Sequence, residues 1–420
     1  MAVWTRRKTW AVIGSGHGGQ ALAAYLALKG EKTSLYNRTP ERLDGVRALG
    51  GIRLEGVVEG FGRPKVVTSD LAEALEGADV VMVVVPSSAH DEIARAMAPH
   101  VGSGQIVVLN PGRTLGAVAF AHRLRQAWAS PDVVVAETDT FIFTSRWVES
   151  GLSHINAIKR RVRLSALPAI RTRQVLGVVR RVLPQFVAAG SVLETGLSNL
   201  GAIFHPAPTL LNLSRVEGPL DFEHYTEGIS PGVARALEVL DSERLEVARS
   251  FRVSVLSAKA WLASVYGCVG DTLHKAIQNT AAYAGLKGPS SLNHRYIFEE
   301  IPTSLVPLVD LARVAGRRAR VAESLVTLAG AVTGIDWEAE GRTLASVGLG
   351  DMTVDEIREF VSVGLRTGAS ARSGRSVART RSFRPGAVVR PLASLAPVMA
   401  AMLDEETAGD GEVLEREATS

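Results

Sequence analysis

Cysteine is almost absent from this chain. Cys268 is the single cysteine among 420 residues, which excludes an intramolecular disulfide framework and a cysteine-rich metal site. The nine histidines are scattered, without a His-x3-His pair, and we therefore predict no metal site. Cys268 lies in the apolar stretch 261–269, so we expect it to be buried in a helix.

Long apolar runs are also lacking. No stretch reaches the ~18–20 residues that a membrane-spanning helix needs, although apolar residues make up 46% of the chain and can fill large cores. The basic N-terminus leads directly into an apolar strand pattern, which argues against a signal peptide. We expect a cytoplasmic protein with no membrane partner.

A strong excess of one charge is missing too. The net charge of +4 is unevenly spread, because 366–390 contain arginines and no acid, whereas 404–417 are mostly acidic. Arginines mixed with Ser, Gly and Ala and without periodicity are typical of disorder. We expect 365–420 to be a disordered tail and predict no nucleic-acid partner.

The most informative segment that is present is a glycine-rich turn. The apolar run 10–13 leads straight into G-x-G-x-x-G, and the helix-forming run 20–28 follows. In dinucleotide sites the first glycine permits the tight turn, the second lets pyrophosphate approach the backbone, and the third allows close helix packing. N–H groups at the helix start then hold the phosphates. We predict cofactor contacts from Gly14, Ser15, Gly16, His17, Gly18 and Gly19.

The next predicted strand, 32–36, indicates which dinucleotide binds. It ends in Asn37 and Arg38, without an acid. An acid at this point binds the ribose 2′-OH of NAD, whereas an arginine suits the 2′-phosphate of NADP. We therefore predict that Asn37 and Arg38 bind the cofactor, with NADP preferred over NAD. A solvated loop position for Arg38 is the alternative.

Strand and helix patterns alternate over the first ~160 residues, as a parallel sheet requires. Ligands bind beyond the carboxyl ends of such strands, which adds Pro86, Ser87 and Asn110 to the predicted cofactor contacts and Thr138 to the predicted substrate contacts. Ordinary turn chemistry is the alternative for each. The strand patterns cover 52–58, 64–67, 80–85, 105–109, 133–136 and 161–164, and a helix pattern covers 173–182.

Long helical patterns take over from about residue 196. We predict an α/β Rossmann domain with a doubly wound parallel sheet over 1–190, followed by an all-α substrate domain over 191–364. The helical patterns cover 232–251, 255–266, 271–284, 301–315, 322–332 and 354–363.

Two polar segments of the second domain stand out. One contains Asn199 and His205, and the other runs from His294 through Arg295 to Glu300. By itself, a histidine before a proline is more often a helix-end hydrogen-bond partner than a catalyst. Arg295 has the alternative of pairing with Glu299 at i,i+4.

The order and spacing of these motifs resemble the octopine/nopaline (opine) dehydrogenase family over about residues 9–364. The resemblance implies a reductive condensation, in which the amine of an amino acid attacks an α-keto acid, pyruvate by default, and nicotinamide hydride reduces the resulting imine. The segments that carry it are 110–114, 199–206, 225–234, 241–245 and 294–302.

The resemblance also implies roles for individual residues. His205 would be the acid/base, a role that suits an imidazole near neutral pH. Arg295 would hold a carboxylate bidentately. Glu300 stands where the family often has an aspartate and would contact the amine substrate, and Asn199 and Thr138 complete the predicted substrate contacts.

Two other interpretations stay open. Ketopantoate reductase and the glycerol-3-phosphate and 6-phosphogluconate dehydrogenases share this layout but use a lysine-centred acid/base. Lys259 and Lys275 lie on predicted helices. An NADP(H)-binding sensor without turnover would need neither His205 nor Arg295. His224 is expected to be structural, and a homodimer is compatible with the helical second domain.

Overall fold

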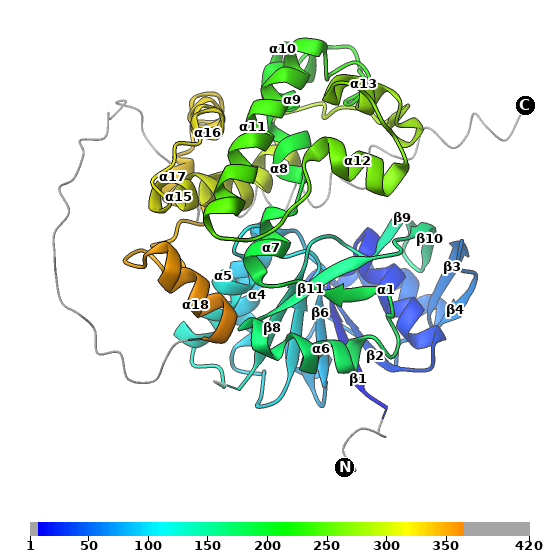
Figure 1. Ribbon diagram of the computed structural model, residues 1–420. Coiled ribbons are helices and arrows are strands. Elements are labelled where there is room, and N and C mark those ends of the chain that lie inside the picture. Colours follow the sequence, from blue (N-terminus) through cyan, green and yellow to red (C-terminus); the bar gives the residue numbers. More distant parts are fainter. Residues whose placement is uncertain (1–6, 131, 365–420) are drawn as a thin grey trace, which may run out of the picture.

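Eight strands form the central sheet of the N-terminal half (Figure 1). The computed structural model describes residues 7–130 and 132–364. The strand order is β12-β11-β8-β7-β6-β1-β2-β5, and neighbouring strands are parallel except for the antiparallel pair β8–β11. The strands are β1 (Thr9–Ile13), β2 (Lys32–Tyr36), β5 (Val66–Thr68), β6 (Val80–Val83), β7 (Ile106–Leu109), β8 (Val134–Thr138), β11 (Val162–Leu167) and β12 (Phe186–Ala188).

Helices cover both faces of this sheet, and the central strands are therefore continuously apolar. All four residues of β6 are fully buried. Helices α1 and α6 pack on one face, while α3, α4 and α5 share a core on the other face with the helical half of the chain. These helices are α1 (His17–Leu28), α3 (Leu71–Leu75), α4 (His90–Met97), α5 (Gly116–Gln126) and α6 (Thr172–Val179), and a short α2 (Asp44–Leu49) follows β2.

A second, four-stranded sheet packs against α1. Its order is β4-β3-β10-β9. The predicted strand at 52–58 is confirmed as β3, and the one at 64–67 joins the main sheet as β5, whereas the hairpin β9–β10 was not predicted. The strands are β3 (Ile52–Gly56), β4 (Gly60–Gly62), β9 (Phe143–Glu149) and β10 (Leu152–Ile158).

The second half is helical, as predicted, and lies beyond the carboxyl ends of the central strands (Figure 1). The predicted helix 271–284 is too long, because α13 ends at Gln278, and the one at 301–315 begins with a π-helical turn, η5 (Ile301–Leu305). The helices are α7 (Val192–Leu197), α8 (Gly201–Phe204), α9 (Pro206–Leu211), α10 (Leu213–Val216), α11 (Pro231–Ser250), α12 (Ala258–Tyr266), α13 (Leu273–Gln278), α14 (Arg295–Phe298), α15 (Val306–Val314), α16 (Arg320–Thr333), α17 (Trp337–Glu340) and α18 (Val354–Val363).

The last described helix bridges the two halves. α18 contacts the turn η3 (Ala169–Arg171) of the first half, and Nε of its Arg358 donates to the Phe251 carbonyl of the second. The domain bounds 1–190 and 191–364 stay a prediction, and the predicted tail 365–420 lies outside the described residues.

The expectation for Cys268 was wrong. Gly267 adopts φ +69 and ends α12, so Cys268 lies in the following loop and is partly exposed. Among the described residues, no helix has the length and apolar character needed to cross a membrane.

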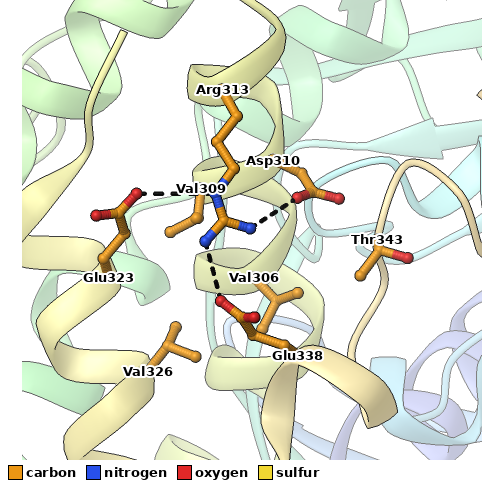
Figure 2. Close-up of a pocket in the computed structure, with 8 residues that line it drawn as sticks. All are labelled: Val306, Val309, Asp310, Arg313, Glu323, Val326, Glu338 and Thr343. Carbon is orange, nitrogen blue, oxygen red and sulfur yellow. Dashed lines mark hydrogen bonds and ion pairs between the residues drawn. The ribbon is translucent and has the colours of Figure 1, made fainter. Parts of the chain in front are cut away.

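An arginine surrounded by acids joins three helices of the second half. Figure 2 shows Arg313 of α15 facing Asp310, Glu323 of α16 and Glu338 of α17 beside a cavity of about 130 Å³. The shortest contact joins Nη2 of Arg313 to Oε1 of Glu338 over 3.0 Å. The Arg313 side chain is 49% exposed, so these contacts are surface ion pairs that stabilise the fold only weakly. None of the predicted site residues belongs to this group.

Candidate active site

The glycine-rich turn has the shape that a dinucleotide requires. Gly14 adopts φ +109, and a Cβ on Gly19 would lie 1.9 Å from the Gly14 carbonyl oxygen, so turn and helix pack as closely as the motif predicts. By contrast, a Cβ on Gly16 would meet no described atom within 4 Å. Gly16 is also the N-cap of α1, so open space adjoins the unpaired N–H groups that bind phosphate.

Side chains of the turn are engaged by neighbouring strands. Oγ of Ser15 accepts from the side-chain amide of Asn37 over 2.6 Å, which ties the turn to the end of β2. Nδ1 of His17 accepts from the Trp147 backbone N–H of β9 over 2.6 Å. Both side chains therefore position the turn, and any contact of these residues with cofactor stays a prediction.

Arg38 at the end of β2 is paired with an acid from α4. Its Nη1 lies 2.9 Å from both Oε1 and Oε2 of Glu92. The two side chains are 41% and 63% exposed. The acid that the sequence lacks at the end of β2 is thus brought there from a distant segment.

Ser87 and Asn110 follow the central strands β6 and β7. The backbone N–H and the hydroxyl of Ser87 both donate to Oε1 of Glu299, over 3.0 and 3.1 Å, so Ser87 links the two halves. Asn110 is buried, and its amide nitrogen donates to the Val108 carbonyl over 2.8 Å. Within the described part of the chain, its Oδ1 has no partner and remains a buried acceptor.

Arg113, which the sequence reasoning did not assign, is the centre of the site. It is buried and has φ +62. Its Nη2 lies 3.2 Å from Oε2 of Glu299, and its Nη1 lies 2.9 Å from Oε1 of Glu300. Nη1 also donates to Oδ1 of Asn199 over 2.9 Å. One arginine of the first half thus neutralises buried carboxylates of the second.

Two features hold Arg113 in this position. Nη1 of Arg342 donates to the carbonyls of Gly112 and Thr114 over 3.2 and 2.7 Å, which fixes the loop on either side. At Gly201, a Cβ would lie 2.1 Å from Oε1 of Glu300 and 2.6 Å from Nη1 of Arg113. A glycine is therefore required where α8 begins.

His205 is held by two contacts at the junction of α8 and α9. Its Nδ1 lies 2.9 Å from Oε1 of Glu300, whose Oε2 accepts from the Ser304 hydroxyl over 2.9 Å. The ring stacks on Tyr296, with centroids 4.0 Å apart and an interplanar angle of 10°. A carboxylate on one nitrogen and a ring against one face fix both the tautomer and the orientation of the imidazole.

The charges of the acids depend on several partners. Burial is the largest single effect and acts to raise the pKa of Glu299 and Glu300, but Arg113 and the other partners together outweigh it, and the pKa of each carboxyl is lowered. The other partners are Arg295 and the Ser87 N–H for Glu299, and His205 for Glu300. Both carboxyls are therefore ionised. Burial lowers the pKa of His205, and the hydrogen bond to Glu300 opposes that shift. An ionised Glu300 can only accept, so Nδ1 carries the proton in that bond and Nε2 remains for proton transfer.

Two nearby histidines have a different character. Burial lowers the pKa of His224 to about 4 and that of His294 to about 3. Nε2 of His224 lies 2.9 Å from the Phe204 carbonyl, which suits the structural role expected for it. Among these three rings, only His205 has a carboxylate partner in the described part of the chain.

The remaining predicted substrate residues lie around this centre. Nε of Arg295 is 3.4 Å from Oε2 of Glu299, as expected from the alternative in which the two residues pair at i,i+4. The Arg295 side chain is 45% exposed. Thr138 is buried, and its hydroxyl donates to the Leu109 carbonyl over 3.3 Å. Both oxygens of Glu300 are engaged by protein groups. Substrate contacts by these residues stay predictions.

The two lysines of the competing interpretation are exposed. Nζ of Lys259 donates to the Asp271 carbonyl over 3.1 Å, and Lys275 lies on the surface of α13. Neither is described in contact with the Arg113 cluster, which consists of Arg113, Asn199, Glu299 and Glu300. Within 7–130 and 132–364, no group of three or more His, Cys, Asp or Glu side chains is arranged to hold a metal ion.

Comparison with known proteins decides between the interpretations. The family profile for the alpha-helical domain of NAD/NADP octopine/nopaline dehydrogenase matches residues 188–333. The opine dehydrogenase of Arthrobacter sp. strain 1C is 39% identical over 355 residues, which are 84% of this chain and 99% of that protein. This chain belongs to the opine dehydrogenase family. It is an NAD(P)-dependent oxidoreductase that acts on CH–NH donors.

Other matches show the fold of this opine dehydrogenase. The profile for the N-terminus of NAD-dependent glycerol-3-phosphate dehydrogenase matches 9–112. Octopine dehydrogenase with NADH and L-arginine has a TM-score of 0.72 at 22% identity, covering 88% of this chain and 100% of that one. NADP+-bound yersinopine dehydrogenase has a TM-score of 0.66 at 14% identity, covering 84% and 98%.

Proposed function

We propose that this enzyme condenses the amine of an amino acid with an α-keto acid, by default pyruvate, to an N-(carboxyalkyl) amino acid. The amine adds to the carbonyl, the carbinolamine loses water to give an imine, and the imine carbon is reduced. The observation that carries the proposal is the His205–Glu300 pair, held against Arg113 where the two halves meet.

His205 would carry out the proton transfers of this reaction. Loss of water from the carbinolamine needs a proton on the departing oxygen, and a protonated Nε2 of His205 can supply it. The Glu300 carboxylate stabilises the imidazolium through Nδ1, while Tyr296 limits rotation of the ring. The neutral imidazole left behind can accept a proton again in the next cycle. Glu300 is a positioning residue in this proposal.

Substrate carboxylates require cationic partners near His205. Arg295 is half-exposed at the start of α14, on the segment that also supplies Tyr296 and Glu300. Its planar fork suits a carboxylate. Asn199 accepts from Arg113, and Thr138 is the last residue of β8. We propose that both residues line the same substrate site.

Nicotinamide hydride, when the cofactor is bound, reduces the imine carbon. The open space at Gly16 and the start of α1 fits the pyrophosphate, and the unpaired Oδ1 of Asn110 can accept from an amide N–H of the cofactor. Arg38 at the end of β2 suits a 2′-phosphate, so we propose NADPH as the preferred reductant.

The test is NADPH and NADH oxidation with pyruvate, with and without pooled amino acids. Oxidation that requires both substrates supports imine reduction, whereas oxidation with pyruvate alone indicates a simple keto acid reductase. His205→Asn should lower kcat by roughly 10²–10⁴-fold, and Lys259→Ala should leave it unchanged. Loss of turnover in the lysine variant instead would contradict the proposal.

A further inference from the structure

An ammonium group whose described hydrogen-bond partner is a hydroxyl lies near the end of β8. Lys159 directly follows β10, and its backbone N–H donates to the Ile142 carbonyl over 3.0 Å, which places it beside the segment after β8. Its Nζ donates to Oγ1 of Thr140 over 2.5 Å. In the described part of the chain, Lys159 makes no ion pair with a carboxylate.

The nearest acid is already engaged. Oδ2 of Asp139 lies 3.5 Å from Nε of Arg163, and Oδ1 accepts from the Arg163 backbone N–H over 3.0 Å. Burial lowers the pKa of Lys159 to about 8, Asp139 opposes this shift, and the positive charge of Arg113 adds to it. The ammonium is thus largely charged at neutral pH, half-buried, and partnered by a neutral hydroxyl.

Such a cation is more stable when an anion binds to it, because a partly buried charge without a counter-charge in direct contact is costly, and Asp139 is paired with Arg163. Thr140, the partner of Lys159, follows two residues after Thr138 at the end of β8. The Thr138 carbonyl accepts from the Gly112 N–H over 3.3 Å, so Lys159 lies at the edge of the sheet that also carries the loop of Arg113. Because Glu299 and Glu300 already surround Arg113, an incoming carboxylate would be repelled there. At Lys159, the described contacts leave ammonium hydrogens for it.

The proposed reaction brings two carboxylates into the site. The carbon that accepts hydride must lie against the nicotinamide, beyond the carboxyl ends of the central strands, and the keto acid's carboxylate is bonded directly to that carbon. The amino acid's carboxylate is separated from it by the nitrogen and the α-carbon. The anion nearest the sheet is therefore the one from the keto acid, and Lys159 belongs to the sheet half.

We propose that Lys159 binds the carboxylate of the α-keto acid, with Thr140 orienting its ammonium group. This inference rests on the proposed function for the identity of the substrate. It assigns the second substrate carboxylate to Arg295, on the helical half, so that each half of the enzyme recognises one of the two acids.

The first test is binding of pyruvate to the NADP+-loaded enzyme by calorimetric titration, which does not depend on turnover. Lys159→Met should weaken pyruvate binding roughly tenfold to hundredfold, the range for a lost charged hydrogen bond, and Lys159→Arg should retain more of it. Lys32→Met, at the opposite end of the sheet, is the charge-matched control and should bind pyruvate normally. NADP+ affinity should be unchanged in all three variants.

Steady-state kinetics provide the second test. Lys159→Met should raise KM for pyruvate and leave KM for the amino acid unchanged, and it should lose the preference of the wild type for pyruvate over methyl pyruvate. The proposal is overturned if pyruvate binds the Met variant as well as the wild type, if the wild type does not bind it, or if NADP+ binding weakens instead. If pyruvate binding depends on Lys159 but the enzyme does not condense pyruvate with an amine, the proposed function is wrong and the role of Lys159 in binding pyruvate stands.

Discussion

The imidazole of His205 lies flat on the ring of Tyr296, with 4.0 Å between the ring centroids. With one face covered and Nδ1 bonded to Glu300, the ring has one orientation relative to the crevice. The proton-transfer atom of the proposed reaction is therefore positioned before substrate binds, which is the arrangement that favours acid/base catalysis.

We predict that Glu300→Gln lowers kcat about 10–100-fold, the usual effect of losing such an orienting partner. Glu300 raises the pKa of His205 and opposes the lowering by burial. Without the Glu300 carboxylate, the part of the pH–rate profile that reports deprotonation of His205 should therefore move to lower pH. A pH–rate profile measures this. Ser304→Ala removes only the hydrogen bond to Oε2 and should shift the profile less; an unshifted profile in Glu300→Gln would exclude the coupling.

We predict that Arg113→Met destabilises the fold by about 3–5 kcal/mol, because two buried carboxylates lose their counter-charge. Arg313→Met is the matched control. Arg313 also faces several acids, but it is 49% exposed, and its loss should cost no more than about 1 kcal/mol. Urea unfolding of both variants measures the free energies. Equal losses would show that burial of Glu299 and Glu300 does not set the cost.

We predict that Glu92→Gln strengthens NADPH binding by up to about fivefold, since an exposed ion pair of ~0.2–1 kcal/mol no longer holds Arg38. NADH binding should not change. Arg38→Met should weaken NADPH binding alone. Fluorescence titration with both cofactors checks this. Weaker NADH binding in Glu92→Gln would mean that Glu92 itself binds the ribose.

We predict a pH dependence of stability from Glu137, the buried acid at the end of β8. Burial raises its pKa to about 7, so the folded state keeps a proton that the unfolded state loses near pH 4.5. The free energy of unfolding should therefore fall as pH rises from about 4.5 to 7, by about 3 kcal/mol.

Glu137→Gln should flatten this slope. Gln resembles the protonated acid, because its oxygen can accept from Ala117 N–H and its amide can donate to Thr195, whose hydroxyl also reaches the Val192 carbonyl. Chemical unfolding of wild type and variant across this pH range gives the two slopes. Parallel slopes would assign the pH dependence to another group, such as Asp139, whose pKa burial raises to about 6.

The sequence predicted the main sheet because its signals are local. The run at β6 is buried on both faces and reads as a continuous apolar strand. The hairpin β9–β10 carries no such signal, because only one residue of β9 and two residues of β10 are buried, and polar residues interrupt its apolar ones. Its partner β3 is distant in sequence, so pairing rather than local preference makes it a strand.

The candidate site was likewise predicted only in part from the sequence. His205 and Glu300 were predicted from motif resemblance, but the contact between them joins segments far apart in the chain. Arg113 lies in the segment 110–114 that carries part of the resemblance, but no role was assigned to it, because Asn110-Pro111-Gly112 is typical of ordinary turn chemistry. Only folding shows that its acidic partners come from the other end of the chain.

The link from Ser87 and Arg113 to Glu299 and Glu300 constrains how this enzyme can recombine with relatives. A crossover between the halves would separate one arginine from the two acids it neutralises. A hybrid whose foreign first half lacked that arginine would inherit a pair of buried negative charges and a misplaced imidazole. Productive hybrids must therefore exchange the 110–114 loop together with the segment 295–305, which carries both acids.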